Sequence, residues 1–233
     1  MIPLRDVIPS RTFPGVTIGL IACNVLVFLF QASLSERTAE SFIHTFAVVP
    51  AYFSLADVFT SLFVHAGITH LAGNLLFLWI FGDNVEDRLG HGRFLIFYLV
   101  SGFVAAFAQT ALNPDSLLPM VGASGAIAGV MGAYLVLYPH SRILMLFPFP
   151  PILFELPAVF FLAFWFFMQF LSGVGTLPIF QAEQISGGVA FWAHVAGFVC
   201  GVALVGRMRR RERMTVDWWD TQTEDQETRR KTF

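Results

Sequence analysis

The sequence predicts an all-α membrane protein, built as one bundle of six transmembrane helices. Apolar residues make up 56% of the 233 residues and charged residues only 13%, whereas a soluble domain usually carries about 25% charged residues. Six separate apolar segments are near the length of a membrane span, and the basic residues that flank them lie almost entirely on one side. We therefore expect a lipid bilayer around the chain and no nucleic acid partner.

The six apolar segments are the basis of the predicted bundle. An α-helix rises 1.5 Å per residue and the hydrocarbon core is about 30 Å thick, so a span takes about 20 residues. The predicted spans cover residues 16–32, 58–81, 94–112, 121–138, 152–171 and 189–205. The fourth and sixth spans are short and rich in glycine and alanine, which is typical of helices packed closely inside a bundle.

The basic residues predict how the bundle is oriented. If the flanks of the spans are numbered alternately, thirteen lysines and arginines lie on the side of both termini, and only Arg37 lies on the other side. The positive-inside rule then predicts that both termini are cytoplasmic. With no transit peptide or large extra domain in view, we expect a multi-pass protein of a prokaryotic plasma (inner) membrane.

The predicted organisation has three parts. A cytoplasmic N-terminal segment covers residues 1–15, the six-helix domain covers 16–206, and a basic, then polar, cytoplasmic tail covers 207–233. Segment 33–57, between the first two spans, is rich in apolar residues, and we expect it to contain an element lying in the outer interface of the membrane. Cys23 and Cys200 lie in apolar runs and are expected to be small buried side chains rather than a disulfide framework.

Polar side chains are costly inside a bilayer, so each one within a span is a candidate for function. The candidates are His65, His70, Asn74, Gln109, Ser124 and His194. Spans two, four and six all cross from the outside to the inside, and His70, Ser124 and His194 each lie in the outward half of one of them. Three polar groups from three helices can therefore meet at a similar depth.

The remaining intramembrane polar residues are interpreted more simply. His70 and Asn74 are four residues apart and share one helix face. His65, five residues before His70, is expected to bond the backbone or a loop. Asn24 and Gln169, on spans one and five, are expected to make ordinary hydrogen bonds between helices.

Glycines flank the serine of the fourth span, which reads Gly122-Ala123-Ser124-Gly125. Glycine lets the backbone turn tightly and lets another chain approach closely. A serine at a helix N-terminus also lies beside backbone N–H groups without intrahelical acceptors, which can stabilise a developing oxyanion.

Pairs of small residues predict that the fourth and sixth spans touch. Gly125 and Gly129 are four residues apart, as are Gly197 and Gly201, and such pairs let two helix backbones come close. This contact would bring His194 within hydrogen-bonding reach of Ser124, the geometry that a nucleophile and its base require. A lone serine often bonds the preceding turn of its own helix, and a lone histidine can line a proton path. A glycine-flanked serine together with a histidine on a second, closely packed helix points to catalysis more specifically than either residue alone.

The chain resembles the rhomboid family of intramembrane serine proteases over residues 46–201. The matching motifs are His70-Leu71-Ala72-Gly73-Asn74, Glu86-Asp87-Arg88, Gly122-Ala123-Ser124-Gly125 and Ala193-His194-Val195-Ala196-Gly197, in the order and spacing of the family. The resemblance implies a rhomboid-like bundle that cleaves other membrane proteins.

Roles for individual residues follow from the resemblance. It implies that Ser124 is the nucleophile and His194 the general base. It implies an oxyanion hole made by His70, Asn74 and the backbone N–H groups of Ala123 and Ser124. Glu86 and Arg88 resemble a structural pair on the cytoplasmic side, with surface or interfacial pairing as the simplest interpretation.

Two positions depart from the family pattern. Ala56-Asp57 stands where many members carry Trp-Arg, so the first loop must be held differently. Ala128 stands four residues after the serine, where some members carry an aromatic side chain that stacks on the histidine. We therefore expect other contacts to orient His194.

The predicted reaction is hydrolysis of a peptide bond near the outer face by a serine–histidine dyad. Asp115 lies in a loop and Glu155 near the cytoplasmic face, so no acid is expected to complete a triad, and neither a metal ion nor a cofactor is expected. Water would enter through a polar outer mouth near Gln109, Asn113 and Ser116. The substrates would be single-span or other membrane proteins that unwind locally, since an intact helix hides its carbonyls in hydrogen bonds.

The fifth span is dominated by bulky aromatic residues, which face lipid in the simplest interpretation and form a lateral gate for substrate in a sharper one. These residues are Phe160, Phe161, Phe164, Trp165, Phe166, Phe167 and Phe170. Two other functions stay open at this point: a non-catalytic rhomboid-like protein that binds and escorts membrane proteins, and a transporter or proton channel. The sequence leaves the oligomeric state open.

Overall fold

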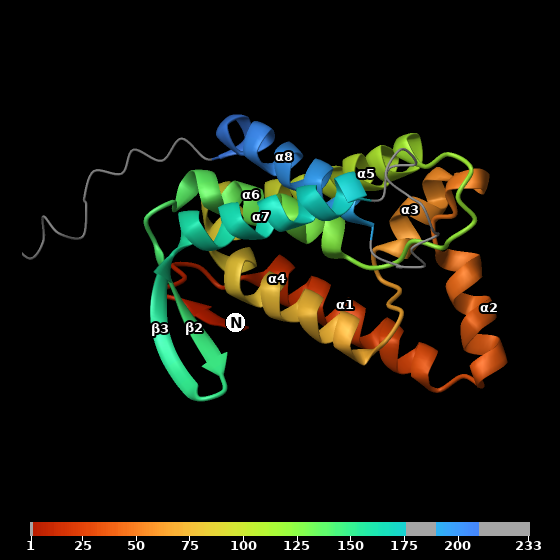
Figure 1. Cartoon of the computed structure of the whole chain (residues 1–233), viewed down its shortest axis with the longest axis horizontal. Coiled ribbons are helices and arrows are strands. Elements are labelled where there is room, and N and C mark those ends of the chain that lie inside the picture. Colours follow the sequence, from red (N-terminus) through yellow and green to blue (C-terminus); the bar gives the residue numbers. More distant parts are fainter. Residues whose placement is uncertain (1, 176–189, 210–233) are drawn as a thin grey trace, which may run out of the picture.

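The computed structural model describes residues 2–175 and 190–209, which form a helical bundle with a small sheet at one end (Figure 1). Within these residues the long helices are α1 (Gly15–Ala32), α4 (Ile68–Leu89), α5 (His91–Leu112), α6 (Ser124–Leu137), α7 (Ala158–Gly175) and α8 (Phe191–Met208). Shorter elements are α2 (Glu36–Phe46), the 3-10 turn η1 (Pro50–Tyr52) and α3 (Leu55–Ser61). The strands are β1 (Ile2–Asp6), β2 (Arg142–Pro148) and β3 (Pro151–Pro157).

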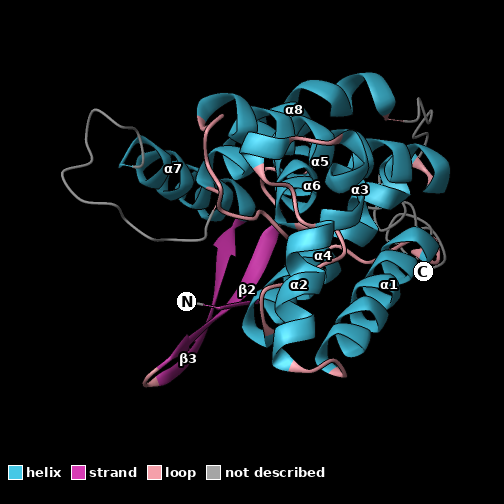
Figure 2. Ribbon diagram, turned by 90° about the vertical axis from the view of Figure 1, so that its right-hand side faces the viewer, coloured by secondary structure: helices cyan, strands magenta, loops and turns pink. Residues whose placement is uncertain are grey.

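Helix α6 lies at the centre of the bundle. Every residue from 125 to 134 is buried, and the helix packs against α4, α5, α7 and α8. Figure 2 shows α5 and α8 beside it. Small side chains at Gly125, Gly129 and Gly132 allow this close packing, and the first residue of this central helix is Ser124.

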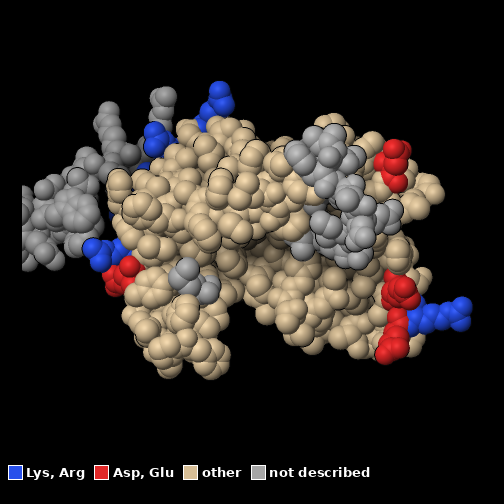
Figure 3. All heavy atoms as spheres, viewed as in Figure 1, with Lys and Arg blue, Asp and Glu red and all other residues tan. Residues whose placement is uncertain are grey.

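The helices of the bundle have the length and the apolar surface that suit a lipid bilayer, as the composition predicts. Four helices, α1, α5, α7 and α8, are long and apolar enough to cross a membrane, and α6 is a shorter apolar helix. Helix α4 has the length of a span and carries its charged residues only in its last two turns. On the face shown in Figure 3, charged side chains gather at the two ends and leave an uncharged band between them. The all-α, rhomboid-like membrane fold is confirmed.

Two of the predicted spans have wrong boundaries. The second, 58–81, is interrupted, because α3 ends at Ser61 and α4 begins at Ile68. The fifth, 152–171, starts too early, because residues 152–157 belong to β3. Their continuous apolar sequence does not distinguish a strand from a helix, and pairing with β2 decides for the strand.

The three strands form one antiparallel sheet in the order β1-β2-β3. It closes the end of the bundle where α6 ends and α7 begins, opposite the end occupied by α2 and α3 (Figure 1). The N-terminal segment therefore contributes a strand that the sequence does not predict. Asp6, at the end of β1, accepts hydrogen bonds from Tyr134 (2.6 Å) and Asn84 (2.9 Å), which ties the strand to α6 and α4.

The connection between the first two spans contains helix α2, whose residues are all at least partly exposed. Its side chain Phe42 packs edge-on against Phe30 of α1, with ring centroids 5.7 Å apart. The two cysteines are free, and the prediction that both are buried is wrong: Cys23 is exposed on α1 and Cys200 is half-buried. Exposure on a helix surrounded by lipid costs a small thiol little.

Candidate active site

Ser124 and His194 meet between α6 and α8. The Nε2 atom of His194 lies 2.7 Å from Oγ of Ser124, a hydrogen-bonding distance. Ser124 is the first residue of α6, and His194 lies in the first turn of α8. The contact predicted from the sequence is therefore present, at the ends of two helices that begin at the same level of the bundle.

Glycines bring these two helices together. A Cβ atom added to Gly197 would collide with the carbonyl oxygen of Gly125, and one added to Gly201 would collide with the carbonyl oxygen of Gly129. The two helix backbones are thus in direct contact, as small residues four apart permit. Any larger side chain would separate α6 from α8 and lengthen the distance from Ser124 to His194.

Gln169 of α7 holds the other nitrogen of the same histidine. Its Oε1 atom lies 2.8 Å from Nδ1 of His194. Because a carbonyl oxygen only accepts hydrogen bonds, Nδ1 must carry the proton, and Nε2 is then left free to accept the hydroxyl proton of Ser124. The sequence identifies Gln169 as a residue bonding between helices but does not reveal its partner.

His70 and Asn74 lie on α4 next to the turn that precedes Ser124. A Cβ atom on Gly122 would fall 2.7 Å from the His70 ring and 3.4 Å from Nδ2 of Asn74, so both side chains face this glycine. Gly122 has φ of +112°, a conformation that L side chains rarely adopt. The turn thus requires glycine for both its backbone conformation and its close approach to His70.

The amide nitrogen of Asn74 is buried and has no hydrogen-bond partner among the described residues. A buried donor without an acceptor costs about 1–3 kcal/mol, so such a group calls for an explanation. Its position beside Gly122, at the N-terminus of α6, makes it available to a bound oxyanion.

His65 lies against this group without joining it by a hydrogen bond. Its Nδ1 atom is 3.3 Å from the carbonyl oxygen of Phe63, which fits the expected backbone bond. Its ring also packs edge-on against His70 with centroids 5.2 Å apart, a contact that the sequence does not predict. His65 therefore supports the ring of His70 from behind.

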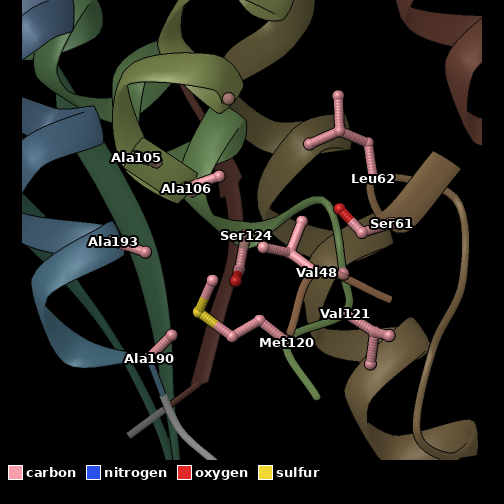
Figure 4. A pocket seen from close by; sticks show the side chains of 13 residues that line it. Val48, Ser61, Leu62, Ala105, Ala106, Met120, Val121, Ser124, Ala190 and Ala193 are labelled. Atoms are coloured by element: carbon pink, nitrogen blue, oxygen red, sulfur yellow. The ribbon is translucent and has the colours of Figure 1, made fainter. Parts of the chain in front are cut away.

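A pocket opens beside Ser124. Figure 4 shows Ala105, Ala106, Ala190 and Ala193 around the serine, with Met120 close by. Small lining residues leave room for a ligand next to the Ser124 hydroxyl.

The loop that forms one wall of this cavity is held by backbone hydrogen bonds. The N–H of Val48 donates to the carbonyl of Met120 (3.0 Å), and the reverse bond is 2.8 Å long. The N–H of Gly122 donates to the carbonyl of Ser61 (2.8 Å). The connection between α2 and α4 thus fixes the turn that carries Ser124.

Residues 52–211 match the Rhomboid domain. The chain belongs to the rhomboid family.

Curated rhomboid relatives come from bacteria and from mitochondria. The chain is 34% identical over 133 residues to the rhomboid protease GluP of Bacillus subtilis, covering 55% of this chain and 26% of that protein. It is 31% identical over 149 residues to the mitochondrial rhomboid protein 1 of Saccharomyces cerevisiae, covering 60% of this chain and 42% of the relative. For the rhomboid protease GlpG of Salmonella choleraesuis the identity is 28% over 130 residues, covering 56% and 46%. The chain thus spans less than half the length of these relatives.

Glu86 of this rhomboid is buried and binds the start of α1. Its carboxylate accepts hydrogen bonds from the N–H of Val16 (2.9 Å), the N–H of Thr17 (2.8 Å) and the Thr17 hydroxyl (2.7 Å), and it contacts Nδ1 of His91 at 2.5 Å. The expectation of a surface or interfacial pair with Arg88 is therefore wrong, because the carboxylate caps a helix N-terminus, where negative charge is favourable.

Gln109 also has a different position from the expected one. Its Oε1 atom accepts hydrogen bonds from the N–H groups of Trp192 (3.1 Å) and Ala193 (3.3 Å). It therefore caps the first turn of α8, next to His194, instead of lining an open mouth. Gln109 therefore stabilises the start of α8, and the prediction that it lines a route for water is wrong.

The aromatic residues of α7 divide into two groups. Phe160, Phe164 and Phe167 are exposed, whereas Trp165 packs against His194 with ring centroids 5.8 Å apart. Trp165 and Gln169 are four residues apart on one face of α7, so both reach the same ring. These contacts orient His194 in a rhomboid that has Ala128 at the expected aromatic position.

Proposed function

We propose that this rhomboid is an intramembrane serine endopeptidase. Ser124 attacks the substrate carbonyl and His194 acts as general base. The observation that carries the proposal is the continuous hydrogen-bonded chain from Gln169 through His194 to Ser124, with distances of 2.8 and 2.7 Å. This is the arrangement of orienting group, base and nucleophile found in covalent catalysis.

The first step transfers one proton and forms one bond. Nε2 of His194 takes the hydroxyl proton as Oγ of Ser124 bonds to the carbonyl carbon, and the carbonyl oxygen becomes an oxyanion. The imidazolium then gives its Nε2 proton to the leaving nitrogen as the peptide bond breaks. Water, deprotonated by the same nitrogen, hydrolyses the acyl-enzyme and restores Ser124.

The oxyanion is stabilised by Asn74, His70 and the backbone N–H groups of Ala123 and Ser124. The unpartnered amide nitrogen of Asn74 and the helix N-terminus at Ser124 support this assignment. Loss of one such donor costs about 3 kcal/mol of transition-state stabilisation, which is more than a hundredfold in rate.

The base is held by an amide, so the catalytic group is a dyad with a positioning residue. Gln169 fixes the tautomer of His194 but carries no charge to stabilise the imidazolium that forms. Weaker charge stabilisation is compatible with a nonpolar site, where a buried carboxylate would cost much free energy.

The substrates are proposed to be membrane proteins cut near the outer end of a transmembrane segment. The pocket beside Ser124 is lined mainly by glycine, alanine and serine and suits a small side chain next to the scissile bond. The substrate helix must unwind there, because helical carbonyls are already hydrogen-bonded. The exposed aromatic face of α7 is the proposed side of entry.

The proposed orientation places both termini in the cytoplasm of a prokaryotic cell. Thirteen of the fourteen basic residues lie on that side of the predicted spans. The sheet of β1, β2 and β3 then lies at the cytoplasmic face, and α2 and α3 lie at the outer face.

The test uses single-span proteins with small residues near the outer end of the span, reconstituted with the enzyme in liposomes. Wild type is expected to release two fragments, and Ser124→Ala and His194→Ala are expected to release none. Ser101→Ala is the matched control, since Ser101 is a buried intramembrane serine on α5. Equal cleavage by wild type and Ser124→Ala would show that Ser124 is not the nucleophile.

A further inference from the structure

The β2–β3 hairpin extends sideways from the end of the helical bundle. Figures 1 and 2 both show its tip projecting away from the bundle. The two strands pair from Arg142↔Pro157 at the base to Pro148↔Pro151 near the tip, which is formed by Phe149 and Pro150. The exposed apolar side chains on this projecting hairpin require an explanation.

The register divides the hairpin into two chemically different faces. Alternate residues of a strand point to opposite faces, and directly paired residues share a face. One face, called the apolar face here, consists of Ile143, Met145, Phe147, Ile152, Phe154 and Leu156. The opposite face, called the charged face here, carries Arg142 and Glu155, which form an ion pair of 3.2 Å, and also Arg5 of β1. The same face includes the apolar residues Leu144, Leu146 and Leu153.

The apolar face is covered at its base and open toward its tip. Ile143 and Met145 are fully buried in the hydrophobic core of the bundle. On the same face, Phe147 is 43% exposed and Ile152 is 51% exposed. The face that packs on the helix ends thus continues, without a charged residue, past the edge of the protein.

The exposed outer half of the apolar face is continuous with its base, which packs on the helix ends. The helices that the base packs against are surrounded by lipid, so a surface that continues sideways from their ends meets the bilayer. Phe149 at the tip is 86% exposed, and aromatic residues are favoured at the boundary of membrane and water. Because Ile143 and Met145 face the core, the charged face is directed away from the helices.

We propose that the β2–β3 hairpin lies flat on the membrane, with Phe147, Phe149 and Ile152 inserted into the lipid leaflet at this end of the bundle. The partner is phospholipid. The hairpin holds the protein at a fixed depth, and because β3 leads directly into α7, it also fixes the end of that helix. The proposal rests on the membrane fold and not on the proposed catalytic function.

Two adjacent residues give a matched test. Ile152 lies on the apolar face and Leu153 on the charged face, and they are 51% and 60% exposed. Each is replaced by cysteine in the full chain with Cys23→Ser and Cys200→Ala, and spin-labelled in liposomes of phosphatidylethanolamine and phosphatidylglycerol. Collision rates are then measured with oxygen, which concentrates in lipid, and with a water-soluble nickel chelate.

The label at 152 is expected to collide mainly with oxygen, and the label at 153 mainly with the nickel chelate. Equal access of the chelate to both positions would overturn the proposal. So would spin–spin broadening at position 152 that persists when the protein is diluted in lipid, because it would show that a second copy of the chain covers the face.

Discussion

The two nitrogens of His194 have different partners, and in the proposed mechanism this difference fixes the direction of proton transfer. Oε1 of Gln169 accepts from Nδ1, so Nε2 faces Ser124 as an acceptor. An imidazole free to exchange tautomers would spend part of its time with the wrong nitrogen protonated. At the scale of single residues, Gln169 is therefore the first residue to mutate.

Gln169→Leu is expected to lower kcat about tenfold while leaving KM nearly unchanged. The loss of one hydrogen bond is worth about 0.5–1.5 kcal/mol, or up to roughly tenfold in rate. Gln169→Glu keeps an oxygen acceptor but adds a carboxylate to this nonpolar site, so it is expected to lose less activity than Gln169→Leu. Steady-state cleavage in liposomes checks both, with the exposed neighbour Met168→Leu as control. An unchanged kcat for Gln169→Leu would remove the proposed positioning role.

Gly122→Ala tests the turn beside the proposed oxyanion hole. The new Cβ would lie 2.7 Å from the His70 ring, on a backbone with φ of +112°. We expect activity to fall about a hundredfold, since displacing one oxyanion donor costs about 3 kcal/mol. The control is Gly92→Ala on α5, where the space beside the glycine is open. Wild-type kcat/KM in a folded Gly122→Ala protein would contradict the assignment.

At the scale of elements, the contact between α6 and α8 determines whether the site forms. Gly201→Ala places a Cβ against the carbonyl of Gly129, whereas Gly206→Ala, on the same helix, meets nothing within 4 Å. Overpacking typically costs about 1–3 kcal/mol, so Gly201→Ala should lower Tm in detergent and reduce cleavage. Gly206→Ala should do neither. Equal Tm values for the two variants would show that the backbones are not in close contact.

Strand β1 is attached through a carboxylate whose ionisation is perturbed. Partial burial raises the pKa of Asp6 to about 6, against the opposing effect of the Tyr134 hydrogen bond and with a further increase from Asp83. The folded protein thus holds this proton more tightly than the unfolded chain. Its contribution to the free energy of unfolding is complete below about pH 4 and is lost as the pH rises through 6.

Asp6→Asn is expected to flatten this part of the pH profile. The difference in Tm between pH 5 and pH 7.5 should shrink by an amount equivalent to about 1 kcal/mol, after allowance for partial exposure of the carboxylate. Thermal unfolding in detergent at both pH values measures it. An identical pH dependence in wild type and Asp6→Asn would exclude Asp6 as the titrating group.

Elements differ in how far their sequence determines them. The glycine spacing of α6 and α8 predicts their contact, because only small residues allow two backbones to touch. The strand at 151–157 is not predictable in the same way, since Ile152, Leu153 and Phe154 would suit a helix equally well. Its conformation depends on β2 and β1, and β1 lies more than 130 residues away in the chain.

At the scale of the whole molecule, the motifs around Ser124 and His194 predict that these two side chains meet, because they combine a serine, a histidine and close-packing glycines. Gln169 is missed as the partner of His194, because no motif surrounds it and the rotation of α7 about its axis is set only by packing. Glu86 is misinterpreted for a similar reason: its partners Val16 and Thr17 lie about 70 residues away. Long-range partners are the information that one sequence lacks.

The surroundings of the site in the whole molecule explain how the proposed reaction could proceed with few polar groups. On the face shown in Figure 3, an uncharged band lies between the charged ends of the bundle, and the Ser124 site lies where α6 and α8 begin, inside the bundle. Lipid and apolar side chains exclude competing water, so each hydrogen bond in the site is stronger than it would be in water. In the proposed mechanism, a serine, a histidine and a few donors can then perform hydrolysis.

Reaction with a fluorophosphonate tests the central claim most directly, because it requires no knowledge of the substrate. The protein in liposomes is treated with the reagent, and the modified peptide is located by mass spectrometry. We expect one adduct, on Oγ of Ser124, that is absent in Ser124→Ala and forms far more slowly in His194→Ala. Absence of an adduct on Ser124 in the folded protein, or an equal rate of modification without His194, would contradict the account.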